Sequence, residues 1–129
     1  MVITIPSSQS LEDVCAALET AVPNHKFGII GQHDMKETMA RKGVDFEREC
    51  RVYEVCNPHQ AKKILDTNME VSTALPCRIS VYPEGDQVML ATIKPTAMLN
   101  MFDVEGVEQV AEEVEATMIA IMEEAAGSA

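Results

Sequence analysis

Two strand patterns joined by a tight turn constrain the fold of this chain most. Apolar and polar side chains alternate from residue 75 to residue 82, as they do in a strand with one face turned to a core. The sequence Pro-Glu-Gly-Asp at residues 83–86 is typical of a turn, and residues 87–94 return as a second strand. This segment therefore predicts an antiparallel hairpin, whose first strand carries Cys77, Ile79 and Val81 on one face.

Helical and extended patterns alternate along the rest of the chain. Ser10, Asp34 and Asn57 each precede an amphipathic stretch and are good N-cap residues, so each predicts the start of a helix. The strand pattern at residues 49–55 has apolar side chains on both faces, so the sequence does not show which face is buried. We expect further strands at residues 1–5 and 26–32, helices at about 11–22, 35–43, 58–67 and 107–125, and a turn at 96–101.

The order of these elements indicates the fold class. A hairpin inside a mixed series of strands and helices, closed by a long amphipathic helix, favours an α+β two-layer sandwich in which helices back one mostly antiparallel sheet. The 129 residues match the size of one ordinary domain, and no internal repeat or low-complexity linker divides them. We therefore expect a single domain over residues 1–129.

The charge of the chain excludes two classes of partner. Ten basic against 21 acidic side chains give a formal net charge of −11. Such a chain repels phosphate backbones and anionic lipid surfaces, so neither nucleic acid nor a membrane is an expected partner. The first residues lack the features of a secretory signal, and no apolar run approaches the roughly 20 residues of a membrane-spanning helix. We expect a cytoplasmic protein.

The four cysteines predict free thiols rather than a disulfide framework. They stand at positions 15, 50, 56 and 77 without a CxxC pair, and a chain in a reducing compartment keeps its thiols reduced. Cys15 lies on the apolar stripe of the first predicted helix, so we expect it to pack as a small hydrophobe. Two arginines nearby in the sequence, Arg48 and Arg51, could clamp an anion, but pairing with surface carboxylates is the simpler expectation.

Chemically versatile side chains gather around the end of the strand at 49–55. Cys56 directly precedes the helix that Asn57 begins, where the helix dipole and free N–H groups can lower a thiol pKa. His59 lies in the first turn of that helix, and Cys77 begins the hairpin. These side chains could bind a small ligand, hold a soft or borderline metal ion, or act as a redox pair. The alternative is that both cysteines pack in the core and His59 lies on the exposed helix surface.

The relative direction of two strands decides between these interpretations. If the strands at 49–55 and 77–82 are parallel neighbours, Cys56 and Cys77 lie at opposite ends, roughly 17–20 Å apart. If the strands are antiparallel, both cysteines lie at the same end of the sheet.

Four short motifs of the chain are Gly43-Val44-Asp45-Phe46, Val55-Cys56-Asn57-Pro58, Leu75-Pro76-Cys77 and Lys94-Pro95-Thr96-Ala97-Met98-Leu99. They resemble one family of uncharacterised proteins, domain-of-unknown-function family 302 (DUF302), over about residues 25–101. The resemblance implies a small α+β fold similar to the TATA-binding-protein-like topology, commonly met as a dimer in bacteria and archaea. It implies no reaction.

Three functional hypotheses follow. The first is a cytoplasmic homodimeric binding module with a small-ligand or metal pocket near Cys56, to which Asn57, His59 and Cys77 would contribute. The second is a thiol-dependent redox or sulfur-handling enzyme, with Cys56 as nucleophile and either Cys77 as resolving thiol or His59 as base. The third is a purely structural dimerisation module. The sequence identifies neither the ligand nor a cofactor.

Overall fold

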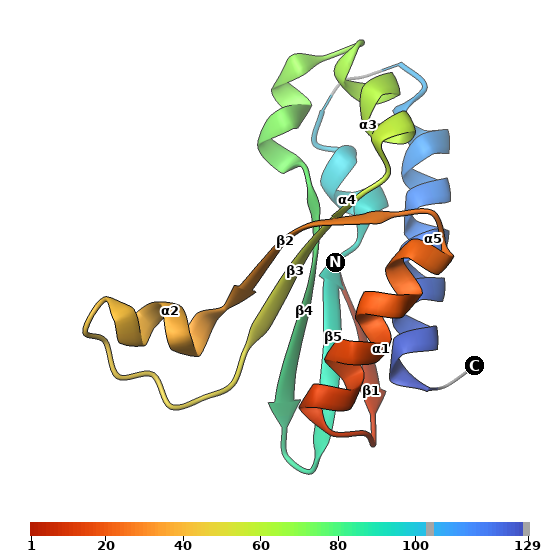
Figure 1. The fold of residues 1–129 in the computed structure, drawn as a ribbon. Helices are drawn as coiled ribbons and strands as arrows, with labels where there is room; N and C mark the ends of the chain where they lie inside the picture. The colour runs from red at the N-terminus through yellow and green to blue at the C-terminus, as the bar shows by residue number, and fades with distance from the viewer. Residues whose placement is uncertain (103–104, 128–129) are drawn as a thin grey trace.

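The computed structural model describes residues 1–102 and 105–127 and places five strands and their helices in the predicted order (Figure 1). The elements are β1 (Val2–Ser7), α1 (Leu11–Asn24), β2 (Gly28–Asp34), α2 (Met35–Arg41), β3 (Arg51–Cys56), α3 (Pro58–Leu65), the 3-10 helix η1 (Met69–Ala74), β4 (Cys77–Glu84), β5 (Gln87–Ile93), α4 (Pro95–Leu99) and α5 (Val107–Ala126).

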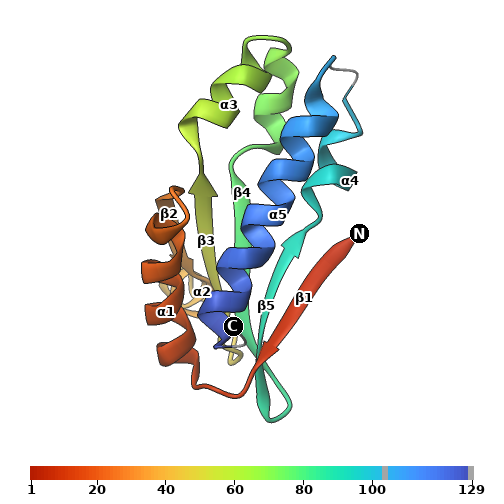
Figure 2. The ribbon, with the colours of Figure 1, turned by 90° about the vertical axis from the view of Figure 1, so that its right-hand side faces the viewer.

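The five strands form one antiparallel sheet in the order β1-β5-β4-β3-β2. The predicted hairpin is its centre, since β4 and β5 turn back on each other with Glu84 opposite Gln87. Helices α1 and α5 lie side by side on one face of the sheet (Figures 1 and 2), whereas α2 projects on the other side. This arrangement confirms the predicted α+β class.

The core lies between that covered face and the two helices. Tyr53 and Val55 of β3 are buried, which settles the face that the sequence left open, and Cys15 of α1 packs beside them as predicted. The predicted face of β4 is also buried. The largest fully buried side chains of this core are Val14, Leu18, Val22, Val55, Ile79, Val81, Leu90, Met118, Ile121 and Met122.

The predicted N-caps all form. The Ser10 hydroxyl accepts a hydrogen bond from the Asp13 amide at 3.1 Å, and the Asp34 carboxylate accepts one from the Glu37 amide at 3.1 Å. Each bond satisfies one amide that the first turn of a helix leaves without an intrahelical partner.

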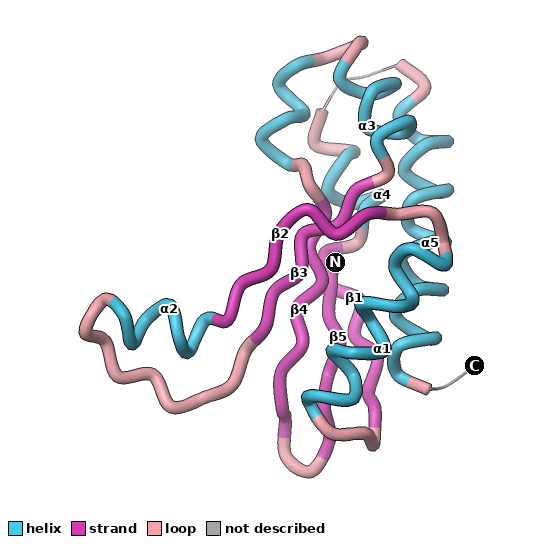
Figure 3. Tube along the Cα trace, in the orientation of Figure 1, coloured by secondary structure: helices cyan, strands magenta, loops and turns pink. Residues whose placement is uncertain are grey.

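Two short helices differ from the expectation (Figure 3). Residues 96–101 were expected to form a turn, but Pro95–Leu99 is the helix α4, because Pro95 ends β5 and also suits the first position of a helix. The segment Met69–Ala74 forms η1, whose amide at Glu70 is capped by the Asn68 side chain at 2.9 Å.

The short helices α3, η1 and α4, together with the first turns of α5, build a second, smaller hydrophobic cluster above the sheet. It consists of Ile64, Val71, Leu99, Val107 and Ala111, and it is separate from the main core.

No helix within residues 1–102 and 105–127 is both long and apolar enough to cross a bilayer.

The one-sided burial of β4 gives a direct test of the fold. We expect Ile79→Ala to lower the free energy of unfolding by about 2–5 kcal/mol, because the truncation leaves a cavity under α1 and α5. Arg78→Ala is the matched control on the exposed face of the same strand, and should change stability by less than about 1 kcal/mol. Urea unfolding of both variants checks this, and equal losses would contradict the one-sided core.

Candidate functional site

The antiparallel pairing of β3 with β4 brings the two predicted site cysteines to the same end of the sheet. Val55 lies opposite Cys77 in the register, and Cys56 is the next residue of β3. The two strands are therefore antiparallel, which is the case in which the sequence predicts that both cysteines lie at the same end of the sheet. Both cysteines are free thiols.

The turn from β3 into α3 is held by Asn57. Its side-chain carbonyl accepts hydrogen bonds from the amides of His59 at 3.0 Å and Gln60 at 3.2 Å. Pro58 occupies the first helical position, where its fixed φ suits the helix and its missing N–H costs nothing. This rigid corner directs α3 over the ends of β3 and β4, with Cys56 at the corner.

A small cavity, here called the thiol cavity, lies beneath α3. Its volume is about 20 Å³, roughly the space that one buried water needs. Its walls come from both hydrophobic clusters, since Val55 and Cys77 belong to the main core and Ile64 and Leu99 to the smaller one. The full lining is Phe27, Val55, Cys56, Asn57, Gln60, Ala61, Ile64, Leu75, Cys77, Leu99 and Val114.

One polar atom in this lining has no hydrogen-bond partner. The side-chain oxygen Oε1 of Gln60 is buried and unbonded, whereas its Nε2 donates to the Glu113 carboxylate at 3.4 Å. A buried acceptor without a partner costs free energy, so a donor that reached it would be favoured. No sequence motif marks Gln60, but its place one turn before Ile64 on α3 puts both side chains on the same helix face.

The electrostatics of the two thiols favour the neutral form. Burial raises the pKa of the Cys56 thiol. Burial, and to a lesser extent a neighbouring Cys56 thiolate, raises the pKa of Cys77 from its ordinary value of 9.0 to about 11. The shifts run opposite to the lowering that the helix N-terminus was expected to give Cys56. Both groups are therefore thiols near neutral pH, where a catalytic cysteine needs a thiolate.

His59 does not join the two cysteines. Its side chain is exposed at the start of α3, and it does not line the thiol cavity. In the described part of the chain no group of three or more His, Cys, Asp or Glu side chains could hold a metal ion, so Cys56, His59 and Cys77 are not brought together as a set of metal ligands. Cys56 and Cys77 instead line the same apolar cavity.

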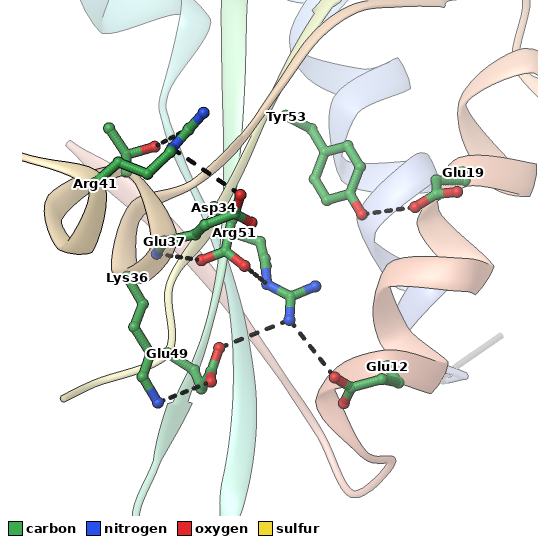
Figure 4. A network of polar contacts seen from close by, with 10 residues as sticks. Glu12, Glu19, Asp34, Lys36, Glu37, Arg41, Glu49, Arg51 and Tyr53 are labelled. Atoms are coloured by element: carbon green, nitrogen blue, oxygen red, sulfur yellow. Dashed lines mark hydrogen bonds and ion pairs between the residues drawn. The ribbon is translucent and has the colours of Figure 1, made fainter. Parts of the chain in front are cut away.

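The two arginines pair with carboxylates, as predicted. Arg48 lies 3.7 Å from Glu84. Arg51 lies within ion-pair distance of three acidic side chains, namely Glu12 of α1, Asp34 at the end of β2 and Glu49 just before β3. The sequence indicated this pairing but not which acidic side chains surround Arg51 (Figure 4).

Comparison with known proteins adds the family context. The family model described as domain of unknown function DUF302 matches residues 3–125. A crystal structure of an uncharacterized conserved DUF302 protein from Bacillus stearothermophilus is 27% identical and superimposes with a TM-score of 0.89, covering 96% of this chain and 97% of that one. No curated protein gives a significant match.

The raised pKa of Cys77 predicts how stability depends on pH. Because the neutral thiol is favoured in the folded state, its contribution is complete below pH 9.0 and is lost as the pH rises towards about 11. The loss should be on the order of 2–3 kcal/mol. Burial raises the pKa of Tyr53 as well, which adds a similar slope at higher pH.

Urea unfolding of the wild type and Cys77→Val between pH 8 and pH 11 separates these two contributions. The valine keeps a side chain of similar size but does not titrate, so its profile should be flatter, and the Tyr53 contribution cancels in the difference. Parallel profiles would show that Cys77 titrates alike in the folded and unfolded chain.

Proposed function

The chain belongs to the family described as domain of unknown function DUF302, and from this premise we propose that it is a binding module whose small ligand enters the thiol cavity. The observation that carries the proposal is the unpartnered Gln60 oxygen in an otherwise apolar cavity beside Cys56 and Cys77. Pockets that bind small molecules combine apolar walls with a few placed polar atoms in this way.

The position of the cavity supports a site that opens. It lies along the boundary between the main core and the smaller cluster, here called the seam. At about 20 Å³ the cavity is too small for a molecule larger than water, so a ligand must separate the two clusters. Movement of α3 and η1 over the sheet would do this without breaking the hydrogen bonds between strands.

The lining restricts the chemistry of the ligand. The walls are apolar, both thiols are neutral at physiological pH, and Gln60 Oε1 is the one buried side-chain acceptor in the described lining that has no partner. A charged ligand would lose its hydration there without compensation. The ligand class that fits is a compact, neutral, mainly apolar molecule with one N–H or O–H donor.

The rival enzymatic hypothesis has less support. A nucleophilic Cys56 would need a lowered pKa or a base beside it, but its pKa is raised, and His59 is exposed and does not line the cavity. A reducing, cytoplasmic setting fits the binding proposal, because all four cysteines are free.

A pair of nearly isosteric molecules tests the ligand proposal. In NMR titrations of the intact protein, phenol should bind about two- to tenfold more tightly than toluene, because only phenol donates a hydrogen bond to Gln60. The shifts should concentrate on α3, the end of β3 and the start of β4. Gln60→Leu should remove the preference, whereas Gln109→Leu, an exposed glutamine on α5, should keep it.

Two results would overturn the proposal. If neither molecule gave saturable shifts in the wild type, the chain would be better described as a structural module. If phenol bound at a different surface, or if Gln60→Leu kept the preference, the cavity assignment would fail. The wild-type comparison stands even if the Gln60 variant is unstable.

We also propose that the chain works as a homodimer, with β1 at the interface. Val2 of β1 and Ile93 of β5 are direct partners in the sheet, and their side chains are 58% and 50% exposed. The pairing of β1 is regular along its whole length, whereas the opposite edge strand β2 carries an irregularity between Ile29 and Gly31. Bulges of this kind discourage pairing at a sheet edge, so β1 is the better edge for a second copy.

Light scattering combined with gel filtration checks the dimer. The wild type should have twice the mass of the chain, and Ile93→Asp should weaken association at least about tenfold by burying a charge. Ile30→Asp, an exposed isoleucine on the other edge, is the matched control and should leave the mass unchanged. A monomeric wild type, or dissociation by Ile30→Asp alone, would contradict the β1 interface.

A further inference from the structure

A second hollow lies between α1 and α2, at the end of β3 away from the thiol cavity. We call it the polar cleft. Its volume is about 350 Å³, within the range of small-molecule sites. Three carboxylates and two guanidinium groups line it, so it has a different character from the apolar cavity under α3. The lining is Glu19, Gln32, His33, Asp34, Glu37, Thr38, Arg41, Arg51, Val52 and Tyr53.

Arg51 forms the floor of the cleft, and its charge is already neutralised. It lies 3.4 Å from Asp34, 3.5 Å from Glu12 and 3.6 Å from Glu49 (Figure 4). Its Nε atom is buried and makes no hydrogen bond, although it faces Asp34. Because three carboxylates surround this one guanidinium, Arg51 holds the two ends of the β2–β3 connection against α1 and has no spare charge for a ligand.

The α1 wall of the cleft offers a free negative charge. Glu19 accepts a hydrogen bond from the buried Tyr53 hydroxyl at 2.8 Å through its Oε2 atom. No described lysine, arginine or histidine lies within ion-pair distance of this carboxylate. The Tyr53 bond therefore fixes the direction of a carboxylate whose charge is uncompensated.

The α2 wall offers a loosely held positive charge. Arg41 is 69% exposed, lies 4.0 Å from Glu37 and donates a long 3.4 Å hydrogen bond to Thr38. An exposed ion pair at this distance contributes little, so Arg41 is free to bind another anion. Helix α2 buries none of its own residues, so this wall belongs to neither hydrophobic cluster.

We propose that the polar cleft binds a small zwitterion, whose ammonium group pairs with Glu19 and whose carboxylate pairs with Arg41. Figure 4 shows these two side chains on opposite walls, with Arg51 between them. A simple amine would leave Arg41 unused, and a simple carboxylate would face the three acidic side chains of the lining. The ligand class is a dipeptide, because its two charged groups are separated by a peptide unit and face opposite walls. The proposal does not depend on the thiol cavity.

NMR titration of the intact protein with glycylglycine tests the inference. We expect saturable shifts at α1, α2 and the start of β3, with a dissociation constant of about 1 mM, because pairs that water reaches are weak. Ethylammonium and propionate carry one charge each and should bind about three- to tenfold more weakly. Raising the salt concentration from about 0.1 M to 1 M should weaken glycylglycine binding, because the Debye length falls from about 10 Å to 3 Å.

Charge-removing variants assign the two walls. Glu19→Gln removes the negative charge of the α1 wall and keeps an acceptor for Tyr53. Arg41→Gln removes the positive charge of the α2 wall. Each should weaken binding about three- to tenfold. Arg48→Gln, whose partner Glu84 lies outside the cleft, is the control and should bind like the wild type.

Three outcomes would overturn the inference. They are an absence of saturable shifts with glycylglycine, binding of ethylammonium as tight as that of glycylglycine, and binding that neither Glu19→Gln nor Arg41→Gln changes. The comparison of the three ligands on the wild type needs no variant, so poor folding of a variant cannot leave the question open.

Discussion

The antiparallel pairing of β3 with β4 is the constraint on which the rest of this structure depends. It sets Tyr53 opposite Ile79 and Val55 opposite Cys77, so that one face of both strands is apolar and is covered by α1 and α5. The same register leaves Cys56 at the corner where α3 begins, one residue beyond the pair that contains Cys77. A slip by one residue would turn these side chains to the opposite face of the sheet and would remove both the core and the shared cysteine site.

Strand β3 connects two sites of opposite character. Its C-terminal end borders the thiol cavity, where Gln60 supplies the unpartnered acceptor among apolar walls. Its N-terminal end carries Arg51 into the polar cleft, where carboxylates outnumber guanidinium groups. The elements that cover these ends, α3 with η1 at one and α2 at the other, are short and contribute few buried residues. The sheet therefore positions both proposed sites, and short helices that bury few residues cover them. Elements with few buried residues generally open at a lower free energy than the central strands of a sheet.

Much of this architecture follows from local sequence patterns. The alternation in β4, the Pro-Glu-Gly-Asp turn and the capping residues Ser10, Asp34 and Asn57 predicted the hairpin and the helix starts, because each is decided by residues close in the chain. The buried face of β3 was not predictable, since it depends on pairing with strands distant in sequence. The two predicted site cysteines line one cavity, but His59 does not line it. Gln60 was not predicted, because a lone glutamine carries no motif. The pairing of Arg51 with carboxylates was predicted, but its partners Glu12 and Asp34 were not, because they come from distant parts of the chain.

The proposed function depends on the thiol cavity lying on a seam that opens without unfolding the sheet. Native-state hydrogen exchange tests this most directly, by comparing the opening free energies of amides in α3 and η1 with those in β3 and β4. The account predicts that the amides of α3 and η1 exchange through a smaller, separate opening, while those of the central strands exchange only on global unfolding. A single opening free energy shared by all four elements would show that the two hydrophobic clusters unfold as one unit, and the seam could not admit a ligand.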